Sequence, residues 1–442
     1  MTLPTYLPAD IKGRLDWVKA PAATAGHADA QVEETVRRVV LEVRARGDAA
    51  VRDFTQEFDG ITVDALRVSD DEISAAVEAL NPDTRADTLF AIANVSAFAR
   101  AQLATMLPLE IETLPGVHLG HRIIPIHTVG AYVPGGRYPL LSAPVMTIVP
   151  AKIAGCTTVI ACLPPTAHPD MIAGCHLSGA DMIFRIGGAQ AIAAMAFGTE
   201  SVPKVDKIVG PGNAFVNEAK RQVFGPVGID QLAGPSEIYV LADDSGDARM
   251  IAADLLAQAE HDVRTRVGLV TTSRRLAKEV VSEVAAQLKT LSTAAVAGAA
   301  WETAGEVVVC ADEATMIAYS DHVAAEHLQV HTRNPKELAA RLSNYGSLFL
   351  GTQASVVYSD KCSGTNHTLP TMGAARYTGG LWVGSFVKVC THQWMTDEGV
   401  ARVAPSAVRQ STTEGMDGHR RAAALRMGNV GSQALDHLTF GG

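Results

Sequence analysis

The feature that most limits the fold of this chain is a repeated alternation of short β-rich runs, glycine turns and helical stretches after residue 119. Between residues 158 and 216 it reads TVIACLPP, then DMIFRIGG with AQAIAAMAFG, then KIVGPGNAFV. This order is typical of a doubly wound parallel sheet. Residues 237–312 repeat it, from EIYVLAD through ARMIAADLLAQAEH to EVVVCAD. We predict an α/β fold with two nucleotide-fold-like parallel-sheet domains, and the two similar units leave an old duplication open.

Four segments follow from this alternation. Residues 29–54 place apolar side chains at helical intervals, so residues 1–124 are predicted to be a helical N-terminal segment that packs partly on the second α/β domain. The first α/β domain is predicted at 125–235 and the second at 236–390. Residues 391–442 turn polar and helical, which predicts a small C-terminal appendage.

Composition and charge narrow the class of protein. The chain has 442 residues, 47% of them hydrophobic, which is enough for two substantial cores. Its formal charge of −10 argues against a broad nucleic-acid surface, which needs clustered Lys and Arg. The six cysteines form no CxxC pair and indicate buried thiols in a reducing compartment, so we expect a cytoplasmic protein. We expect neither a signal peptide nor a membrane span.

A candidate metal site begins with Gln258 and His261, three residues apart near the end of a predicted helix and therefore on one face of it. The same spacing is common among surface residues and core hydrogen bonds. Asp360 and His419 are the other candidates, and spacing cannot join them to the first two. If all four converged, two imidazoles, one carboxylate and one amide oxygen would suit Zn²⁺ and leave it a good Lewis acid.

A candidate acid–base pair is formed by the adjacent residues Glu326 and His327, where a predicted helix runs into a strand. A surface glutamate beside a hydrogen-bonded histidine would give the same sequence. In the functional interpretation His327 removes a hydroxyl proton near neutral pH and Glu326 activates a water. Two neighbouring bases suit a reaction with two separate proton removals.

Glycine-rich turns are the candidate phosphate sites, because no GxGxxG follows a strand. Residues 187–190 (GGAQ) and 210–213 (GPGN) each follow an apolar run and open onto a predicted helix, although ordinary strand-to-helix turns look alike. Glycine lets the backbone approach a pyrophosphate, and a helix N-terminus supplies N–H donors. Residues 132–137 (YVPGGR) and 363–370 (SGTNHTLP, around His367) are open to interpretation as ligand-binding loops or plain turns.

Taken together, eight segments resemble the histidinol dehydrogenase superfamily in the family's own order. They are YVPGG, GGAQAIA, VGPGNAFVNEAKR, GIDQLAGPSE, AQAEHD, AEHLQV, SGTNHTLPT and EGMDGH. Each segment alone is weakly specific, whereas eight in order are highly specific. The resemblance spans about residues 115 to 420 and implies an alcohol oxidised through an aldehyde to an acid, with two NAD reduced.

The resemblance also implies roles for individual residues. It implies Zn²⁺ ligands at Gln258, His261, Asp360 and His419. It implies Glu326 and His327 as the catalytic pair. It implies NAD contacts at Tyr132, Gln190 and Asn213, and substrate contacts at Ser236, His367 and Glu414. The family's homodimers complete each site with the partner's C-terminal appendage, so Glu414 and His419 are expected to act in trans.

Two further segments favour one branch of the family. Residues 135–146 and 375–391 are more similar to the sulfopropanediol 3-dehydrogenase branch, which oxidises 2,3-dihydroxypropane-1-sulfonate to sulfolactate, than to the histidinol branch. A sulfonate needs cationic or N–H donors, for which Arg376 and Arg137 are the candidates. Glu414 suits an amine and keeps histidinol as the alternative. A metallohydrolase is disfavoured because the sequence has no HExxH motif. A scaffold protein that had lost its chemistry is disfavoured because the candidate catalytic and metal residues are all present.

Overall fold

The computed structural model describes residues 9–22, 30–135 and 139–428. It divides into two compact units, of which the first comprises residues 1–101 and 126–386 and the second residues 102–125 and 387–442. Within the described ranges, no helix is long and apolar enough to cross a membrane. Parallel sheets with helices on their faces confirm the predicted α/β class.

The first sheet has five parallel strands in the order β6-β5-β4-β7-β8. Their bounds are β4 Thr128–Tyr132, β5 Thr158–Leu163, β6 Met182–Arg185, β7 Lys207–Val209 and β8 Gly228–Ile229. The chain winds outward from β4 to one side through β5 and β6, then returns to the other side of β4 for β7 and β8. The winding therefore reverses between β4 and β7, the place where open α/β sheets bind ligands.

This sheet is covered by helices that follow its own strands and by helices of the N-terminal segment. Those that follow its strands are α7 (Ser142–Ala154), α8 (Pro169–Leu177), α9 (Gly188–Phe197) and α10 (Ala214–Val223). Those of the N-terminal segment are α3 (Ala30–Arg46), α4 (Asp48–Asp59), α5 (Asp70–Ala79) and α6 (Pro82–Leu103). The apolar stripe of α3, with Val36, Val39 and Val43 fully buried, packs into the same core as α9 and α10.

The second sheet has six strands in the order β1-β11-β10-β9-β12-β13, and only β1 is antiparallel. Their bounds are β1 Leu15–Lys19, β9 Glu237–Ala242, β10 Arg266–Thr271, β11 Glu306–Cys310, β12 His327–His331 and β13 Ser347–Leu350. Strand β1 brings part of the N-terminal segment onto this sheet. The winding reverses between β9 and β12, so both sheets have the same order around their first strand.

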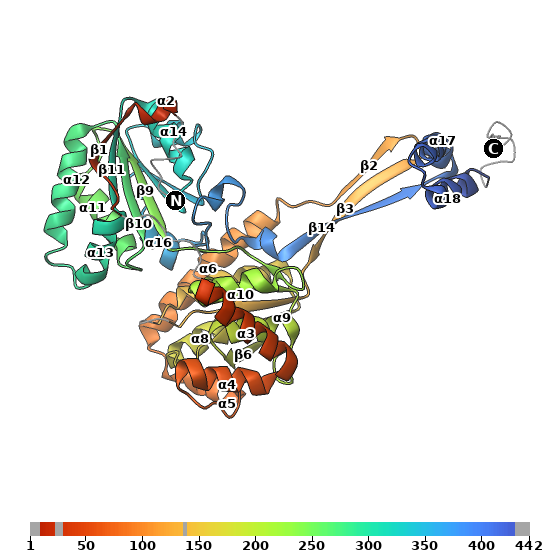
Figure 1. Cartoon of the computed structure of the whole chain (residues 1–442), viewed down its shortest axis with the longest axis horizontal. Helices are drawn as coiled ribbons and strands as arrows, with labels where there is room; N and C mark the ends of the chain where they lie inside the picture. The colour runs from red at the N-terminus through yellow and green to blue at the C-terminus, as the bar shows by residue number, and fades with distance from the viewer. Residues whose placement is uncertain (1–8, 23–29, 136–138, 429–442) are drawn as a thin grey trace. The chain divides into compact units, whose positions relative to one another are not determined.

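The two faces of the second sheet are covered by different helices (Figure 1). Ile238 and Val240 of β9 point to a core with α11 (Ala248–Ala259), α12 (Arg274–Gln287) and α13 (Ala294–Ala304). Tyr239 and Leu241 point to the opposite core with α14 (Glu313–Val323). The remaining short helices are α2 (Ala9–Lys12), α15 (Pro335–Ala339), α16 (Val356–Lys361), η1 (Ala374–Arg376) and η2 (Val383–Phe386).

The second unit is a three-stranded antiparallel sheet, β14-β3-β2, followed by two helices. Their bounds are β2 Leu109–Leu114, β3 Val117–Pro125, β14 Val387–Met395, α17 Asp397–Thr413 and α18 Asp417–Gly428. The sequence predicts the two helices and a β-rich run from residue 122, which overlaps β3, but not β2 or β14. Every residue of β2 is exposed, so burial imposes no alternation of apolar and polar residues on it from which the strand could be recognised.

Candidate functional site

The catalytic pair predicted from the sequence lies at the amino-terminal edge of the second sheet. His327 is the first residue of β12 and Glu326 directly precedes it, while Glu237 begins β9. Strands β9 and β12 are parallel neighbours, with His327 opposite Ile238. Because parallel strands begin at the same edge, Glu326, His327 and Glu237 meet at the point where the winding of this sheet reverses.

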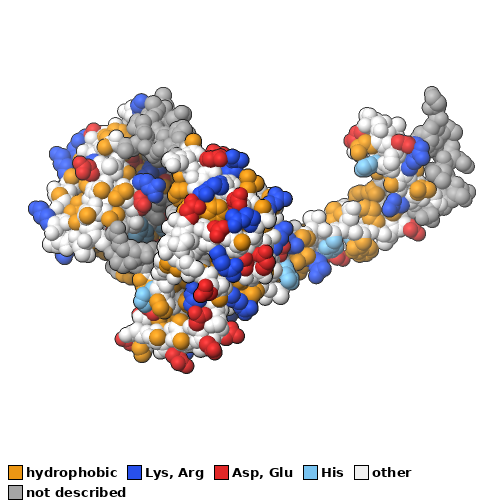
Figure 2. All heavy atoms as spheres, turned by 60° about the horizontal axis from the view of Figure 1, so that its bottom comes forward, with side chains coloured by type: hydrophobic (Ala, Val, Ile, Leu, Met, Phe, Trp, Pro, Cys, Tyr) orange, Lys and Arg blue, Asp and Glu red, His pale blue; other side chains and the backbone are white. Residues whose placement is uncertain are grey.

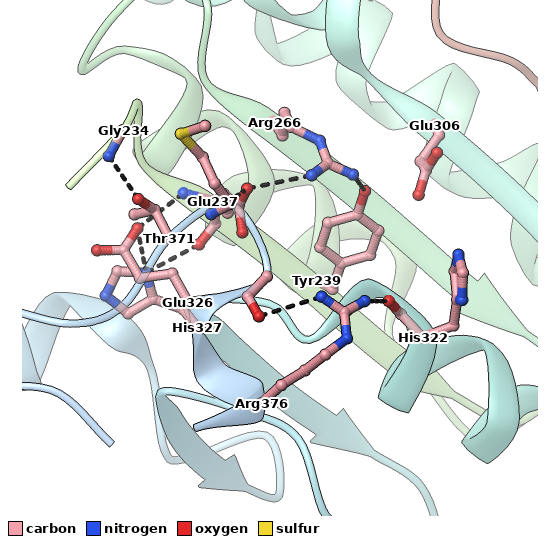
Figure 3. Close-up of polar contacts among 12 residues, drawn as sticks. Gly234, Glu237, Tyr239, Arg266, Glu306, His322, Glu326, His327, Thr371 and Arg376 are labelled. Atoms are coloured by element: carbon pink, nitrogen blue, oxygen red, sulfur yellow. Dashed lines mark hydrogen bonds and ion pairs between the residues drawn. The ribbon is translucent and has the colours of Figure 1, made fainter. Parts of the chain in front are cut away.

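The backbone of Glu237 holds both members of the pair (Figure 3). Its amide N–H donates to Oε2 of Glu326 at 2.8 Å, and its carbonyl oxygen lies 2.9 Å from Nδ1 of His327. A carbonyl oxygen only accepts, so Nδ1 carries the proton of the neutral ring. The opposite nitrogen, Nε2, is then left with a lone pair, and it is buried without a hydrogen-bond partner among the described residues. This is the state that a general base requires.

Burial changes the proton affinity of both groups. It lowers the pKa of His327 to about 4, so the ring is neutral at neutral pH. It raises the pKa of Glu326 well above its usual value, and the nearby carboxyls of Glu237 and Asp360 add to the rise. Oε2 of Glu326 lies 3.5 Å from Nδ1 of His327. A positive charge brought close to this pair would favour the ionised form of Glu326.

Two of the four metal candidates and one substrate candidate gather around this pair. His261 follows α11, Asp360 lies in the last turn of α16, and His367 lies in the loop beyond. Nδ1 of His367 is 3.9 Å from Oδ1 of Asp360. A proton on His261 would lower the pKa of both His327 and His367, so the three rings lie near one another. Gln258 is buried on α11, three residues before His261.

The cluster keeps its histidines neutral and raises the pKa of its carboxyl group, which is still mostly ionised at neutral pH. Burial, helped by the cation of Lys361, lowers the pKa of His367 to about 3. The same two causes lower the pKa of His261, although part of this side chain is exposed to solvent. Burial raises the pKa of Asp360 to about 6. Neutral imidazoles beside one carboxylate are a donor set that a divalent cation prefers.

The other predicted substrate and metal residues have different positions. Ser236 directly precedes β9, and its carbonyl accepts the amide of Arg266. Arg376, at the end of η1, donates to the carbonyls of Gly373 and His322, so its guanidinium is already engaged with backbone. Glu414 and His419 belong to the second unit and are both exposed. Arg137 lies outside the described residues.

A polar network behind the catalytic pair was missed in the sequence (Figure 3). Arg266 donates to Oε1 of Glu237 at 3.1 Å and to the hydroxyl of Tyr239 at 2.8 Å, and Oε1 of Glu237 also accepts the amide of Met372 at 3.2 Å. Glu306 accepts from Tyr319. Residues 237, 266, 306 and 327 each begin an apolar strand with an ionisable side chain. That shared position is the signal by which the network was recognisable.

The predicted NAD residues lie at the carboxyl edge of the first sheet, on both sides of the reversal between β4 and β7. Tyr132 ends β4, and its hydroxyl accepts the amide of Gly188, the first residue of α9, at 3.2 Å. Gln190 is buried with an unpartnered side-chain oxygen. Asn213 is the N-cap of α10. Two helix N-termini and two glycine turns therefore meet at the edge where a dinucleotide pyrophosphate would bind.

The turn after β7 has a conformation that only glycine adopts without strain. Gly210 has φ +118°, and a Cβ there would lie 2.1 Å from the carbonyl oxygen of Tyr132. A buried ion pair between Lys220 and Asp230 holds this turn. Lys220 donates to the carbonyl of Gly210 at 3.1 Å, and Asp230 accepts the amide of Gly210 at 2.7 Å. The turn is therefore held through both the carbonyl oxygen and the N–H of Gly210.

Comparison with known proteins agrees with this geometry. Residues 23–427 match the sequence model of the histidinol dehydrogenase family. A histidinol dehydrogenase homolog from Mesorhizobium japonicum is 48% identical over 91% of this chain and 81% of its own. A sulfopropanediol 3-dehydrogenase from Ruegeria pomeroyi is 42% identical over 97% and 100%, and a histidinol dehydrogenase from Vibrio cholerae is 44% identical over 93% and 94%. The crystal structure of histidinol dehydrogenase from Elizabethkingia anophelis superposes with a TM-score of 0.88 at 34% identity, covering 93% of this chain and 95% of that one.

Proposed function

The chain belongs to the histidinol dehydrogenase family, a family of NAD-dependent dehydrogenases, and on that premise we propose that it oxidises a primary alcohol through an aldehyde to a carboxylic acid. The overall change consumes one water and transfers two hydrides to two NAD. The single observation that carries the proposal is the unpartnered, buried Nε2 of His327 beside Glu326. Such a nitrogen makes no hydrogen bond among the described residues, so its lone pair is free to meet a substrate hydroxyl.

The two members of the pair act on different protons. Nε2 of His327 accepts the hydroxyl proton of the alcohol and, in the second oxidation, that of the aldehyde hydrate, while its Nδ1–H stays bonded to the carbonyl of Glu237. Glu326 accepts a proton from the water that attacks the aldehyde. NAD, when bound, would supply the hydride acceptor for each oxidation, and a Zn²⁺ held by the site would supply a Lewis acid for the substrate oxygen. The Glu237 backbone keeps both bases in place throughout.

The residues present fit a zinc ion. Gln258, His261 and Asp360 would supply an amide oxygen, an imidazole and a carboxylate, and the lowered pKa of His261 keeps that ring free to bind metal. The described residues contain no group of three His, Cys, Asp or Glu side chains placed to hold a metal, and the proposed set therefore needs the Gln258 amide and a ligand from elsewhere. His419 would be that fourth ligand.

Chelation should therefore abolish turnover, and a metal-free protein with full activity would contradict the zinc role.

The glycine turns support the NAD proposal. Tyr132, Gln190 and Asn213 all lie at the switch point of the first sheet, where the N-termini of α9 and α10 would face the pyrophosphate. The unpartnered oxygen of Gln190 would accept a ribose or amide donor.

A second copy of the chain is the proposed partner. Apolar side chains are exposed over the three-stranded sheet of the second unit (Figure 2). They are Leu109, Ile111, Leu114, Val389, Trp394 and Met395. We propose that a homodimer covers them, and that Glu414 and His419 of one copy complete the site of the other. A cytoplasmic location, suggested by the six free cysteines, is part of the same proposal.

The proposed substrate is 2,3-dihydroxypropane-1-sulfonate, with sulfolactate as product. The similarity to a sulfopropanediol 3-dehydrogenase over the full length of that relative supports it. The exposed cation of Lys361 lowers the pKa of His261, Asp360 and His367, so it lies beside the cluster where an anionic headgroup would bind. Histidinol is the second candidate, favoured by relatives such as the Vibrio cholerae enzyme and by Glu414, which suits an amine.

A substrate panel tests the proposal. Absorbance at 340 nm is followed with NAD and, in turn, the sulfonate, histidinol and an uncharged diol. We expect the highest kcat/KM for the sulfonate. Strong turnover of histidinol with none of the sulfonate would instead assign the histidinol reaction, and no NADH from any alcohol would refute the dehydrogenase.

The cationic contact is tested by two substitutions. Lys361→Met should raise KM for the sulfonate by about tenfold to a hundredfold, with a smaller effect on the uncharged diol, because a charge-assisted contact contributes about 1.5 to 3 kcal/mol. Arg376→Ala tests the other candidate in the same way. Equal losses on both substrates would assign Arg376 to its carbonyl contacts with Gly373 and His322.

The division of labour is tested by supplying the aldehyde directly. His327→Ala should slow both half-reactions by about a hundredfold or more, as loss of a general base does. Glu326→Gln should mainly slow oxidation of the aldehyde, since only that step uses water. A Glu326→Gln variant that oxidised aldehyde normally and failed on alcohol would reverse the assignment.

A further inference from the structure

A single carboxylate, Asp254, links the three elements that carry the catalytic and metal-holding residues. Asp254 lies in the middle of α11 and is half-buried. The hydroxyl of Ser355 donates to its Oδ1 at 2.7 Å. With the amide of Gln329 oriented to suit its neighbours, the Gln329 nitrogen donates to Oδ2 of Asp254 at 3.0 Å. Each oxygen of this carboxylate therefore holds a different element.

Each of these contacts lies close in the chain to a site residue. Asp254 is one helical turn before Gln258 on α11. Ser355 is the N-cap of α16, the six-residue helix that carries Asp360. Gln329 is two residues after His327 on β12, and side chains two apart on a strand point to the same face.

The oxygen of the Gln329 amide makes a further contact between β12 and α16. It accepts the backbone N–H of Val356, the first residue of α16, at 3.3 Å. Helix α16 is too short to be stable alone, so its position depends on contacts with its neighbours. Two of those contacts, from Ser355 and Val356, lead to Asp254 directly or through Gln329. The position of Asp360 relative to Gln258 and His261 therefore depends on this carboxylate.

We propose that Asp254 is a positioning residue that fixes the spacing between α11 and α16 and thereby the spacing of the metal-holding side chains. It touches neither the metal nor the substrate. The inference rests on the proposed zinc site. Partners of this kind, which hold ligand-bearing elements in place, typically contribute tenfold to a hundredfold to metal affinity.

The test compares two alanine substitutions on the same helix. Asp254→Ala removes the link, whereas Asp247→Ala removes the N-cap contacts of α11 with Arg249 and Met250 and leaves the link intact. Zinc dissociation constants of the full-length protein are measured by competition with a chromogenic chelator, at a temperature where each variant is folded. We expect Asp254→Ala to bind zinc about tenfold to a hundredfold more weakly and Asp247→Ala to bind like the wild type.

The outcomes separate this inference from the proposed function. A wild-type protein that does not bind zinc would overturn both. Wild-type zinc binding with unchanged affinity in Asp254→Ala would overturn only the role of Asp254, as would equal weakening in Asp247→Ala. If Asp254→Ala does not fold, Ser355→Ala replaces it, with Ser355→Thr as the variant that keeps the hydroxyl. Weaker zinc binding in Ser355→Ala that Ser355→Thr restores supports the proposal, and unchanged affinity in Ser355→Ala refutes it.

Discussion

Replacing Lys220 with Met should weaken NAD binding by disturbing a turn that the lysine supports from behind. The Lys220 and Asp230 side chains are 1% and 2% exposed, so the substitution leaves a buried carboxylate without its cation. Removing one partner of a buried pair costs about 3 to 5 kcal/mol. Asp230 keeps the amides of Gly210 and Gln231 as donors, which favours the lower end, about 3 kcal/mol.

The effect on the cofactor follows from the same contacts. Lys220→Met also removes the hydrogen bond to the carbonyl of Gly210, so the turn between β7 and α10 keeps only one of the two hydrogen bonds that hold Gly210. We expect KM for NAD to rise about tenfold, equivalent to about 1.4 kcal/mol, while the zinc dissociation constant stays unchanged. Initial rates at saturating alcohol and varied NAD measure the first quantity, and urea unfolding measures the stability loss.

The matched control is another lysine–aspartate pair of the same domain. Lys152 lies 3.0 Å from Asp181, whose carboxylate also accepts the backbone amide of Val159, but the pair is partly exposed and sits before β6, at the opposite edge of the sheet. Lys152→Met should cost at most about 1 kcal/mol and leave KM for NAD unchanged. If Lys220→Met were destabilised as expected and still had the wild-type KM for NAD, the turn after β7 would not belong to the NAD site.

Three further predictions concern the two sheets. Because burial lowers the pKa of His327 from 6.5 to about 4, the unfolded chain binds a proton between those values that the folded chain does not, so the unfolding free energy should fall as pH is lowered through this window. In the metal-free protein His327→Gln should remove up to about 1.4 kcal/mol per pH unit from that slope, measured by urea titrations at about pH 6 and pH 4.5, inside the window. Gly210→Ala should weaken NAD binding more than tenfold in calorimetric titrations and leave zinc binding intact, since its Cβ would meet the carbonyl of Tyr132 at 2.1 Å. Arg266→Met should lower the unfolding free energy by about 3 kcal/mol by stranding the buried Glu237, and Glu237→Gln in the same chain should restore part of the loss.

The sequence was sufficient for the α/β class because the strands of both sheets are nearly continuous apolar runs. Residues 237–242 are all buried, as a central parallel strand requires, and the glycine turns mark where such strands end. The strands of the second unit lack this signal. Residues 109–114 are all exposed, and residues 387–395 are exposed or half-buried. The second of these strands pairs antiparallel with residues 117–125, more than 250 residues earlier in the sequence, and no local pattern records such a pairing.

The candidate site was predictable in its residue types but not in its states. The sequence indicated His327 as a candidate base, whereas the tautomer that would let it act as one depends on the carbonyl of Glu237, 90 residues away. It likewise indicated Arg376 as a cation for the substrate, whereas its contacts with the carbonyls of His322 and Gly373 depend on the folded loop. Long-range contacts of this kind decide the protonation state of a side chain and whether its polar atoms are free to bind a ligand. The spacing of residues along the chain does not reveal such contacts.

The two sheets share one winding order, yet the proposed cofactor and metal sites lie at opposite edges of it, and helix polarity explains the difference. At the carboxyl edge of the first sheet, α9 and α10 begin, so their free N–H groups and positive dipole ends suit the phosphates of NAD. At the amino edge of the second sheet, α11 and α16 end, so Gln258, His261 and Asp360 lie at carbonyl-rich, negative helix termini. A divalent cation is favoured there and a phosphate is not. A duplicated α/β unit can therefore supply both an anion site and a cation site without a change of fold, by placing side chains at one edge or the other.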